Sequence, residues 1–289
     1  MKRNTVLLVA AKLVFVFLML PAGLSAQHVM RVLAIGNSFS EDAVESYLSP
    51  LAQADGVELI IGNMFIPGCS LETHWNNAQH SLPAYSYRKI VDGKLIKTEN
   101  QALVAAIKDE NWDIITFQQV SSKSGLVNSF FPYITNLLRY VQAEATNPEV
   151  KYALHQTWAY ASNSTHPGFI NYDNSQERMY SAIVETVSKV AEQTQIDIII
   201  PAGTAIQNGR TSFVGDNFCS DGYHLNAQIG RYTAACAWYE KFLGRHVIGN
   251  PFVPVGMSPI EASIAQYAAY YAVKQAKVIT SMRHFSSID

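Results

Sequence analysis

The chain has 289 residues, a formal net charge of −2 and 48% hydrophobic residues, which is the composition of an ordinary globular protein. This near-neutral charge argues against a nucleic-acid-binding surface or a surface for anionic membranes, because either needs a clear excess of Lys and Arg. After the first 26 residues no apolar run is long enough to span a bilayer, so we expect no stable membrane insertion.

The first 26 residues have the three regions of a secretory signal peptide. Two basic residues precede an apolar run from Val6 to Leu20, and Leu24-Ser25-Ala26 supplies the small residues of a cleavage site. An uncleaved anchor is the alternative, but no positive stop-transfer cluster follows. We therefore expect cleavage after Ala26 and a secreted or periplasmic protein, with 27–289 as a single domain.

Short apolar runs rich in β-branched residues alternate with helical patterns along the rest of the chain. This alternation predicts a three-layer α/β/α sandwich around a five-stranded parallel sheet. The predicted strands are 30–35, 57–65, 113–117, 150–154 and 197–200. The predicted helices are 41–55, 100–109, 127–145, 173–194, 227–243 and 259–282.

Two local signals add detail to this pattern. An insertion near 74–98 carries Asp92-Gly93 between two strand-like runs, which predicts a β-hairpin. At the start of the last helix, Ser258-Pro259-Ile260-Glu261 has a capping Ser, a Pro at the first helical position and a Glu that completes a capping box.

The first segment that could carry chemistry is Gly36-Asn37-Ser38-Phe39-Ser40, which follows the first predicted strand. It places Ser38 at the carboxyl end of a strand and near a helix N-terminus, where open α/β sheets bind ligands. Ser38 is a candidate nucleophile. The alternative is a serine that only caps the helix, and Ser40 is the better cap candidate.

The second segment is the loop Ser220-Asp221-Gly222-Tyr223-His224-Leu225-Asn226. A hydroxyl nucleophile needs a neutral imidazole to accept its proton and a carboxylate to orient the ring. A separation of three residues in a turn lets Asp221 reach one ring nitrogen of His224 while the other faces Ser38. A purely structural hydrogen-bonded pair is the alternative.

Together these segments resemble the SGNH, or GDSL-like, hydrolase superfamily over about residues 30–243. That superfamily has a Gly-Asp-Ser nucleophile motif near its N-terminus and an Asp-x-x-His near its C-terminus; here Asn37 replaces the Asp. The resemblance implies a flavodoxin-like sandwich, with Ser38 as nucleophile, His224 as general base and Asp221 as its orienting acid.

The resemblance also implies an oxyanion hole, in which Gly68 of Pro67-Gly68-Cys69 is a donor by position; a simple turn glycine is the alternative. The superfamily's Gly-x-Asn-Asp block is absent, and Phe117-Gln118-Gln119 stands in its place. A Gln amide can donate the same hydrogen bond. Because side chains alternate along a strand, only one Gln can face the site; we expect Gln118, with Gln119 as the alternative. Both amides could instead be structural.

Four further residues are candidates for the substrate cleft, because they follow predicted strands or the Gly68 loop: His74, Trp75, His155 and Trp158. Aromatic packing beneath the hairpin is the alternative for the first two. No His-Glu-x-x-His or Cys/His cluster is present, so we expect no metal and no cofactor. A Cys69–Cys219 bridge is conceivable, but buried free thiols at Cys69, Cys219 and Cys236 are the simpler interpretation.

The sequence thus favours a secreted serine esterase, with an O-acyl (acetyl) group on a carbohydrate as the expected substrate. One alternative is a lipid or aryl esterase of the GDSL type, which would show a contiguous apolar acyl groove. The other is an inactive glycan-binding protein on the same scaffold. The expected partner is a small-molecule or glycan ester and no nucleic acid; the oligomeric state has no signal in the sequence.

Overall fold

A computed structural model of the chain describes residues 29–285. The expected signal peptide at 1–26 lies outside the described residues. Within 29–285, no helix has both the length and the apolar character needed to cross a membrane.

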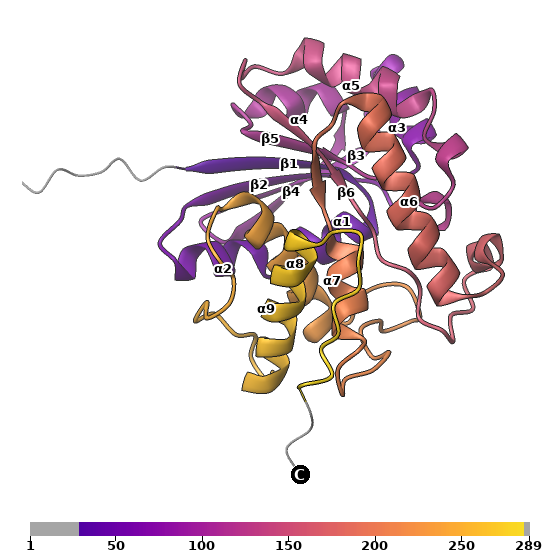
Figure 1. Ribbon diagram of the computed structural model, residues 1–289. Coiled ribbons are helices and arrows are strands. Elements are labelled where there is room, and N and C mark those ends of the chain that lie inside the picture. Colours follow the sequence, from indigo (N-terminus) through magenta and orange to yellow (C-terminus); the bar gives the residue numbers. More distant parts are fainter. Residues whose placement is uncertain (1–28, 286–289) are drawn as a thin grey trace, which may run out of the picture.

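A single seven-stranded sheet runs through the middle of the molecule (Figure 1). Its strand order is β4-β3-β2-β1-β5-β6-β7. The five predicted strands are confirmed as neighbouring parallel strands: β1 (Met30–Gly36), β2 (Leu59–Phe65), β5 (Ile114–Phe117), β6 (Lys151–His155) and β7 (Ile198–Ile200). Their carboxyl ends therefore meet at one edge of the sheet, where ligands bind in open α/β folds.

The other two strands come from the insertion and make the sheet mixed. β3 (Tyr85–Val91) pairs antiparallel with β2 and with β4 (Lys94–Gln101). Asp92 and Gly93, which form the turn, have φ angles of 51° and 72°. Positive φ at both central residues is what a two-residue hairpin turn requires, and Asp-Gly adopts it at low cost. The sheet therefore has seven strands where five were predicted.

Helices cover both faces of the sheet, as the alternation predicted (Figure 1). One face carries α3 (Leu71–Gln79), α4 (Leu103–Asp109), α5 (Tyr133–Glu144) and α6 (Gln176–Thr194). The other carries α1 (Ser38–Val44), α2 (Leu48–Ala54), α7 (Ala202–Gly209), α8 (Ile229–Phe242) and α9 (Pro259–Lys274). Three short 3-10 helices lie in loops: η1 (Ser121–Lys123), η2 (Val127–Ser129) and η3 (Pro167–Tyr172).

Proline explains two of the differences from the predicted helix ranges. The last predicted helix, 259–282, is also too long, because α9 ends at Lys274. The helix expected at 41–55 is two helices, and Pro50 lies in the first turn of the second one, where a missing N–H is tolerated. The helix expected at 127–145 begins only after Pro132. The predicted capping box at the start of α9 is confirmed, since Ser258 Oγ accepts from the Glu261 N–H and Glu261 accepts from the Ser258 N–H.

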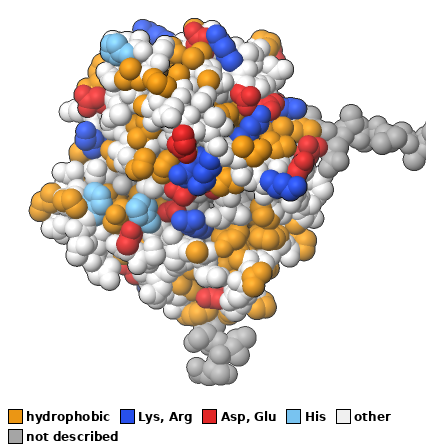
Figure 2. Space-filling view, turned by 180° about the vertical axis from the view of Figure 1, so that it is seen from behind, with side chains coloured by type: hydrophobic (Ala, Val, Ile, Leu, Met, Phe, Trp, Pro, Cys, Tyr) orange, Lys and Arg blue, Asp and Glu red, His pale blue; other side chains and the backbone are white. Residues whose placement is uncertain are grey.

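The surface shows no separation of charge by sign on the face seen in Figure 2, where acidic and basic side chains lie next to one another among hydrophobic patches. Several pairs are within bonding distance; for example, Lys89 Nζ lies 2.7 Å from Asp109 Oδ2 and 2.6 Å from Glu110 Oε1. Interspersed charges produce little long-range field, so this face has no evident attraction for polyanions.

Candidate active site

The turn between β1 and α1 presents Ser38 at the carboxyl edge of the sheet. Asn37, not the expected Ser40, is the N-cap of α1: its Oδ1 accepts from the Phe39 N–H at 3.0 Å. Ser40 instead packs inward, with its Oγ 2.7 Å from the Asn37 carbonyl oxygen. A Cβ at position 36 would lie 2.5 Å from Ser40 Oγ, so this turn requires Gly36.

The structure brings Ser38, His224 and Asp221 into one chain of hydrogen bonds. Ser38 Oγ lies 2.9 Å from His224 Nε2, and His224 Nδ1 lies 2.7 Å from Asp221 Oδ2. The other carboxylate oxygen of Asp221 accepts from the His224 N–H at 2.8 Å and the Tyr223 N–H at 3.1 Å. With a proton on Nδ1, the ring accepts the Ser38 hydroxyl proton at Nε2, which is the arrangement that activates a serine.

The surroundings keep Asp221 ionised and hold the His224 ring in place. Burial opposes ionisation of Asp221, but hydrogen bonds from His224 and Tyr223 outweigh it and hold the pKa of this carboxyl below its usual value. The His224 ring packs against Tyr223, with centroids 4.2 Å apart, and against Phe39 at 6.0 Å. A charged Asp221 favours the Nδ1–H tautomer and stabilises the imidazolium that forms when Ser38 loses its proton.

A second carboxylate, Asp42 of α1, anchors the loop that carries Asp221 and His224. Its Oδ2 accepts from the Leu225 N–H at 2.8 Å, and its Oδ1 lies 2.7 Å from Arg231 Nη2 of α8. Burial raises the pKa of Asp42 to about 6, although Arg231 and the Leu225 N–H oppose the shift. Asp42 therefore ties the helix that bears Ser38 to the loop that bears His224.

On the other side of Ser38 lies the loop after β2, which contains Gly68. Gly68 has a φ of 61°, and a Cβ built on it would meet no heavy atom within 4 Å, so its backbone borders open space. The loop is fixed to the turn that carries Ser38, because Asn37 Nδ2 donates to the Cys69 carbonyl oxygen at 2.9 Å. Gly68 and Ser38 line the same pocket, so their backbone N–H groups are candidates for an oxyanion hole.

The bonds of Gln118 and Gln119 favour the structural alternative over the expected oxyanion role. Gln118 is buried; its Nε2 donates to Asn37 Oδ1 at 2.7 Å, and its Oε1 lies 2.8 Å from His155 Nδ1. Gln119 is also buried, accepts from the Leu71 N–H at 3.0 Å, and donates to the Ser129 carbonyl oxygen at 2.8 Å. Both amides are thus engaged inside the protein.

None of the four expected cleft residues lines the pocket at Ser38, so this expectation is wrong, and three of them are buried. His74 is fully buried and stacks on Tyr85 at 5.6 Å, and its Nδ1 lies 2.9 Å from the Tyr85 hydroxyl, so the packing alternative holds for it. His155 is buried, and Trp158 is buried with its ring 4.3 Å from Phe39. Trp75 is half-buried and packs against the core.

The pocket at Ser38 has a volume of about 300 Å³ and is lined by residues from five segments of the chain. These residues are Asn37, Ser38, Phe39, Pro67, Gly68, Val120, Ser121, His166, Tyr223 and His224. His166 and Tyr223 were not predicted for the site. The only sequence signal for His166 is His-Pro-Gly, in which His166 caps η3, while Tyr223 lies inside the Asp-x-x-His motif itself.

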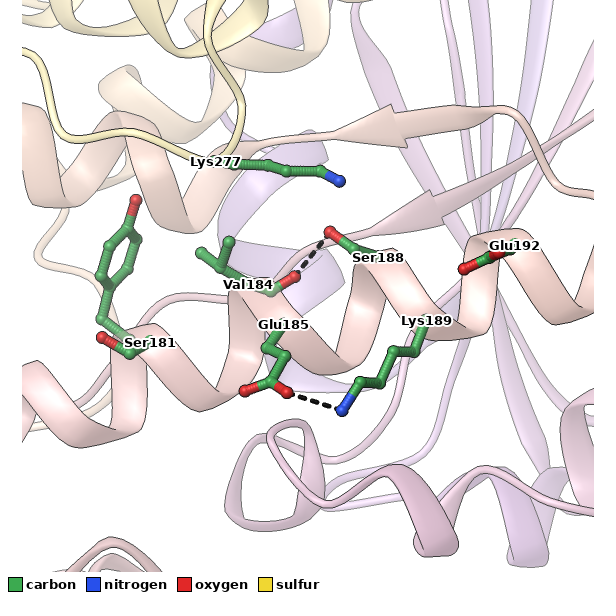
Figure 3. Close-up of a pocket in the computed structure, with 8 residues that line it drawn as sticks. Ser181, Val184, Glu185, Ser188, Lys189, Glu192 and Lys277 are labelled. Atoms are coloured by element: carbon green, nitrogen blue, oxygen red, sulfur yellow. Dashed lines mark hydrogen bonds and ion pairs between the residues drawn. The ribbon is translucent and has the colours of Figure 1, made fainter.

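A larger hollow of about 660 Å³ lies along α6, and Ser38 is not among the residues that line it. Figure 3 shows Lys277 extending across it from the segment after α9. The polar groups of α6 bond to one another there: Lys189 Nζ to Glu185 Oε1 at 2.6 Å, and Ser188 Oγ to the Val184 carbonyl oxygen at 2.8 Å. No nucleophile and base are paired among these lining residues, so chemistry is assigned to the smaller pocket.

The three cysteines of the described residues form no disulfide bond. Cys69, Cys219 and Cys236 are all free thiols, so the conceivable Cys69–Cys219 bridge is not formed. In 29–285 no group of three or more His, Cys, Asp or Glu side chains is arranged to hold a metal ion.

The chain belongs to a family described as "Domain of unknown function (DUF4886)", whose model matches residues 31–272. It is 48% identical to a DUF4886 family protein from Bacteroides uniformis ATCC 8492, whose crystal structure superposes with a TM-score of 0.87 over 88% of this chain and 98% of that chain. No functionally curated protein matched the sequence.

Distant solved structures were also found. Axe2, an acetyl xylan esterase from Geobacillus stearothermophilus, is 14% identical with a TM-score of 0.46, over 79% of this chain and 97% of that chain. A GDSL-like lipase from Bacteroides thetaiotaomicron VPI-5482 is 12% identical with a TM-score of 0.43, over 74% and 90%. Likeness at this level does not transfer an activity or a substrate.

Proposed function

We propose that this protein is a serine hydrolase that cleaves carboxylic esters. The observation that carries the proposal is the continuous chain of hydrogen bonds from Ser38 Oγ through both ring nitrogens of His224 to Asp221. A structural Asp–His pair would need only one of these contacts. A retired scaffold that only binds glycans would have no need to keep the serine hydroxyl 2.9 Å from the imidazole.

In the proposed reaction the Ser38 oxygen attacks the ester carbonyl carbon while its proton passes to His224 Nε2. The N–H groups of Ser38 and Gly68 stabilise the negative charge on the carbonyl oxygen. His224 then gives the proton to the departing alcohol, which leaves an acyl-serine. Water, deprotonated by the same imidazole, attacks the acyl group, releases the carboxylic acid and restores Ser38.

The finer proposal is that the substrate is a short O-acyl group, such as acetyl, on a carbohydrate. A pocket of about 300 Å³ is small for a ligand site and suits a short acyl chain. Its walls mix aromatic and polar side chains, with Ser121 and His166 beside Phe39 and Tyr223. A lipid esterase needs a continuous apolar groove for its acyl chain, and this mixed lining favours the carbohydrate ester.

Hydrolysis of 4-nitrophenyl acetate by the wild type and Ser38→Ala tests the proposal. We expect kcat to fall by at least ~10³-fold in the variant, because removing the nucleophile abolishes the covalent route. A fluorophosphonate probe should label the wild type and not the variant. Ser181→Ala, at an exposed serine of α6, is the matched control and should behave as the wild type. Full turnover or labelling in the Ser38 variant would refute the assignment.

We also propose that the protein acts outside the cytoplasm, since its first 26 residues have the pattern of a secretory signal. N-terminal sequencing of the protein recovered from the periplasm or medium of an expressing bacterium should begin at Gln27. Recovery of an intact N-terminus in the membrane fraction would favour the uncleaved anchor instead.

A further inference from the structure

His166 stands in the pocket with one ring nitrogen already committed to the protein. Its Nδ1 accepts from the Gly168 N–H at 3.0 Å, which caps η3. A ring nitrogen that accepts carries no proton, so the neutral imidazole has its hydrogen on Nε2. Within 29–285, no hydrogen bond involves His166 Nε2, although the residue lines the pocket with Ser38 and His224. This N–H is a donor without a partner at the place where substrate would sit.

The ring is neutral and held in a fixed orientation. Its centroid lies 4.8 Å from that of Tyr160 and 4.8 Å from that of Tyr223, the latter in an edge-to-face arrangement. Burial lowers the pKa of His166, and nearby His224 lowers it further, with Asp221 partly opposing. An oriented donor loses little conformational entropy when it binds a ligand.

The loop that carries His166 is pressed against the catalytic loop. The Ala161 N–H donates to the Gly222 carbonyl oxygen at 2.8 Å. Gly222 has a φ of 90°, and a Cβ built there would lie 3.0 Å from the Ser164 Cα, so the two loops approach as closely as a glycine allows. On its other side, η3 is tied to η1, because Asn171 Nδ2 donates to the Ser122 carbonyl oxygen at 3.0 Å.

The strand order places His166 on the side of the departing alcohol. β1 lies between β2, which leads to Gly68, and β5 and β6, which lead to Val120 and to the His166 loop. His166 is therefore across Ser38 from Gly68, and it lines the pocket together with His224. In acyl transfer the carbonyl oxygen points to the oxyanion donors, and the alcohol oxygen points to the base that protonates it.

We propose that His166 Nε2 donates a hydrogen bond to an oxygen of the alcohol part of the ester, such as a sugar hydroxyl, and so selects polyol esters over esters of plain alcohols. This inference rests on the proposed function, because it assumes that Ser38 and His224 perform acyl transfer.

His166→Asn separates substrate recognition from capping. The Asn Oδ1 occupies the position of Nδ1 and can still accept from the Gly168 N–H, while the donor at Nε2 is lost. His166→Gln places an amide nitrogen near the position of Nε2 and restores the donor. His80→Asn is the matched control, because His80 is an exposed histidine at the end of α3 whose Nδ1 also bonds to the backbone.

The probes are 4-nitrophenyl acetate, whose alcohol has no hydroxyl to accept a hydrogen bond, and a mono-O-acetylated methyl xyloside. For His166→Asn we expect kcat/KM to fall roughly three- to tenfold on the sugar acetate, the effect of one neutral hydrogen bond, and to stay within about twofold of wild type on the aryl acetate. His166→Gln should recover most of the loss. His80→Asn should match the wild type on both probes.

Other outcomes overturn the inference. Equal losses on both probes would mean that His166 only supports the fold of the site, and no loss on the sugar acetate would mean that it makes no contact. A wild type that cleaves the aryl ester through Ser38 but not the sugar acetate would refute this inference and leave the proposed function standing. If the wild type cleaves neither probe and Ser38 resists the fluorophosphonate, the proposed function itself fails.

Discussion

Asn37 joins three segments of the candidate site through one side-chain amide. Its Nδ2 donates to the Cys69 carbonyl oxygen, and its Oδ1 accepts from Gln118 Nε2. Gln118 Oε1 in turn accepts from His155 Nδ1, and burial lowers the pKa of His155 to about 3, which keeps that ring neutral. An Asp at position 37 could not donate to the Cys69 carbonyl oxygen, so an Asn in the turn that carries Ser38 fits the polarity of its partners.

This hydrogen-bond pattern predicts different defects for the two glutamines. Gln118→Ala should lower kcat roughly tenfold, less than the 10²–10³ of a direct oxyanion donor, because it acts only through Asn37. Gln119→Ala should leave kcat near native but lower the free energy of unfolding by about 1–3 kcal/mol, since the buried Leu71 N–H loses its partner. Urea unfolding and initial rates of both variants provide the measurement. A 10²- to 10³-fold fall in kcat for Gln118→Ala at unchanged KM would restore the oxyanion role.

The sequence was enough to bring out Ser38, Asp221 and His224 as candidates because the two motifs that contain them are short local patterns, and the structure brings the three side chains together. The depth of a side chain is not a local pattern. His155 and Trp158 do follow a strand at the expected edge of the sheet, but a position at a strand end does not say whether a side chain rises into the pocket or packs below it. Trp158 packs below because Phe39 presents a flat ring to it. His166 had no motif, since its role depends on a loop folding against the catalytic loop.

At the scale of elements, Asp42 of α1 is paired with Arg231 of α8. Burial in the folded protein disfavours the ionised form of this carboxyl. The pKa of Asp42 in the folded protein is about 6, above the 3.8 of a free carboxyl. A group with a raised folded-state pKa contributes stability below its unfolded pKa, and this contribution is lost as pH rises through the folded value. Ionisation of Asp42 thus lowers the free energy of unfolding by about 3 kcal/mol at a pH well above 6, compared with pH 4 or below.

Asp42→Asn removes this titration and keeps an oxygen that can accept from the Leu225 N–H. The free energy of unfolding of the variant, relative to wild type, should therefore rise between pH 4 and pH 7. Urea unfolding of both proteins at one-unit intervals measures this difference, and other titrating groups largely cancel in it. A difference that is flat or falls with pH would show that the Arg231 ion pair outweighs burial. The variant should also lose activity, because the loop bearing His224 loses its ion-paired anchor.

Helix boundaries show what a single sequence can and cannot specify. The capping box of α9 was predictable because every group in it lies within four residues. The break between α1 and α2 was missed, although Pro50 marks it, because apolar periodicity continues across the break. Helix α7 was missed because eight residues after a short strand carry little periodic signal; its place is set by contacts with α8 and α9, which lie later in the chain.

For the molecule as a whole, the order of strands decides which segments can meet. Five strands and their parallel arrangement were predictable, since buried apolar runs alternate with helices. That β1 lies between β2 and β5, which brings residues 38, 68 and 120 to one pocket, depends on how the strands pair across the whole chain. The hairpin was predictable as a local unit, but its addition to the edge at β2 was not.

The reactivity of the thiols tests the whole fold, because Cys69 and Cys236 are buried and Cys219 is half-buried in it. Burial raises the pKa of Cys69 to about 12 and of Cys219 to about 11, and raises that of Cys236 well above its usual value. Neutral thiols react slowly, so Ellman's reagent at pH 8 should modify the native protein far more slowly than the denatured protein. In denaturant three thiols should react, and two in Cys219→Ala. The melting temperature should be the same with and without reductant.

If only one thiol reacted in denaturant and reductant lowered the melting temperature, a Cys69–Cys219 bridge would be present after all. Closing a loop of this length with a disulfide contributes about 5 kcal/mol to stability.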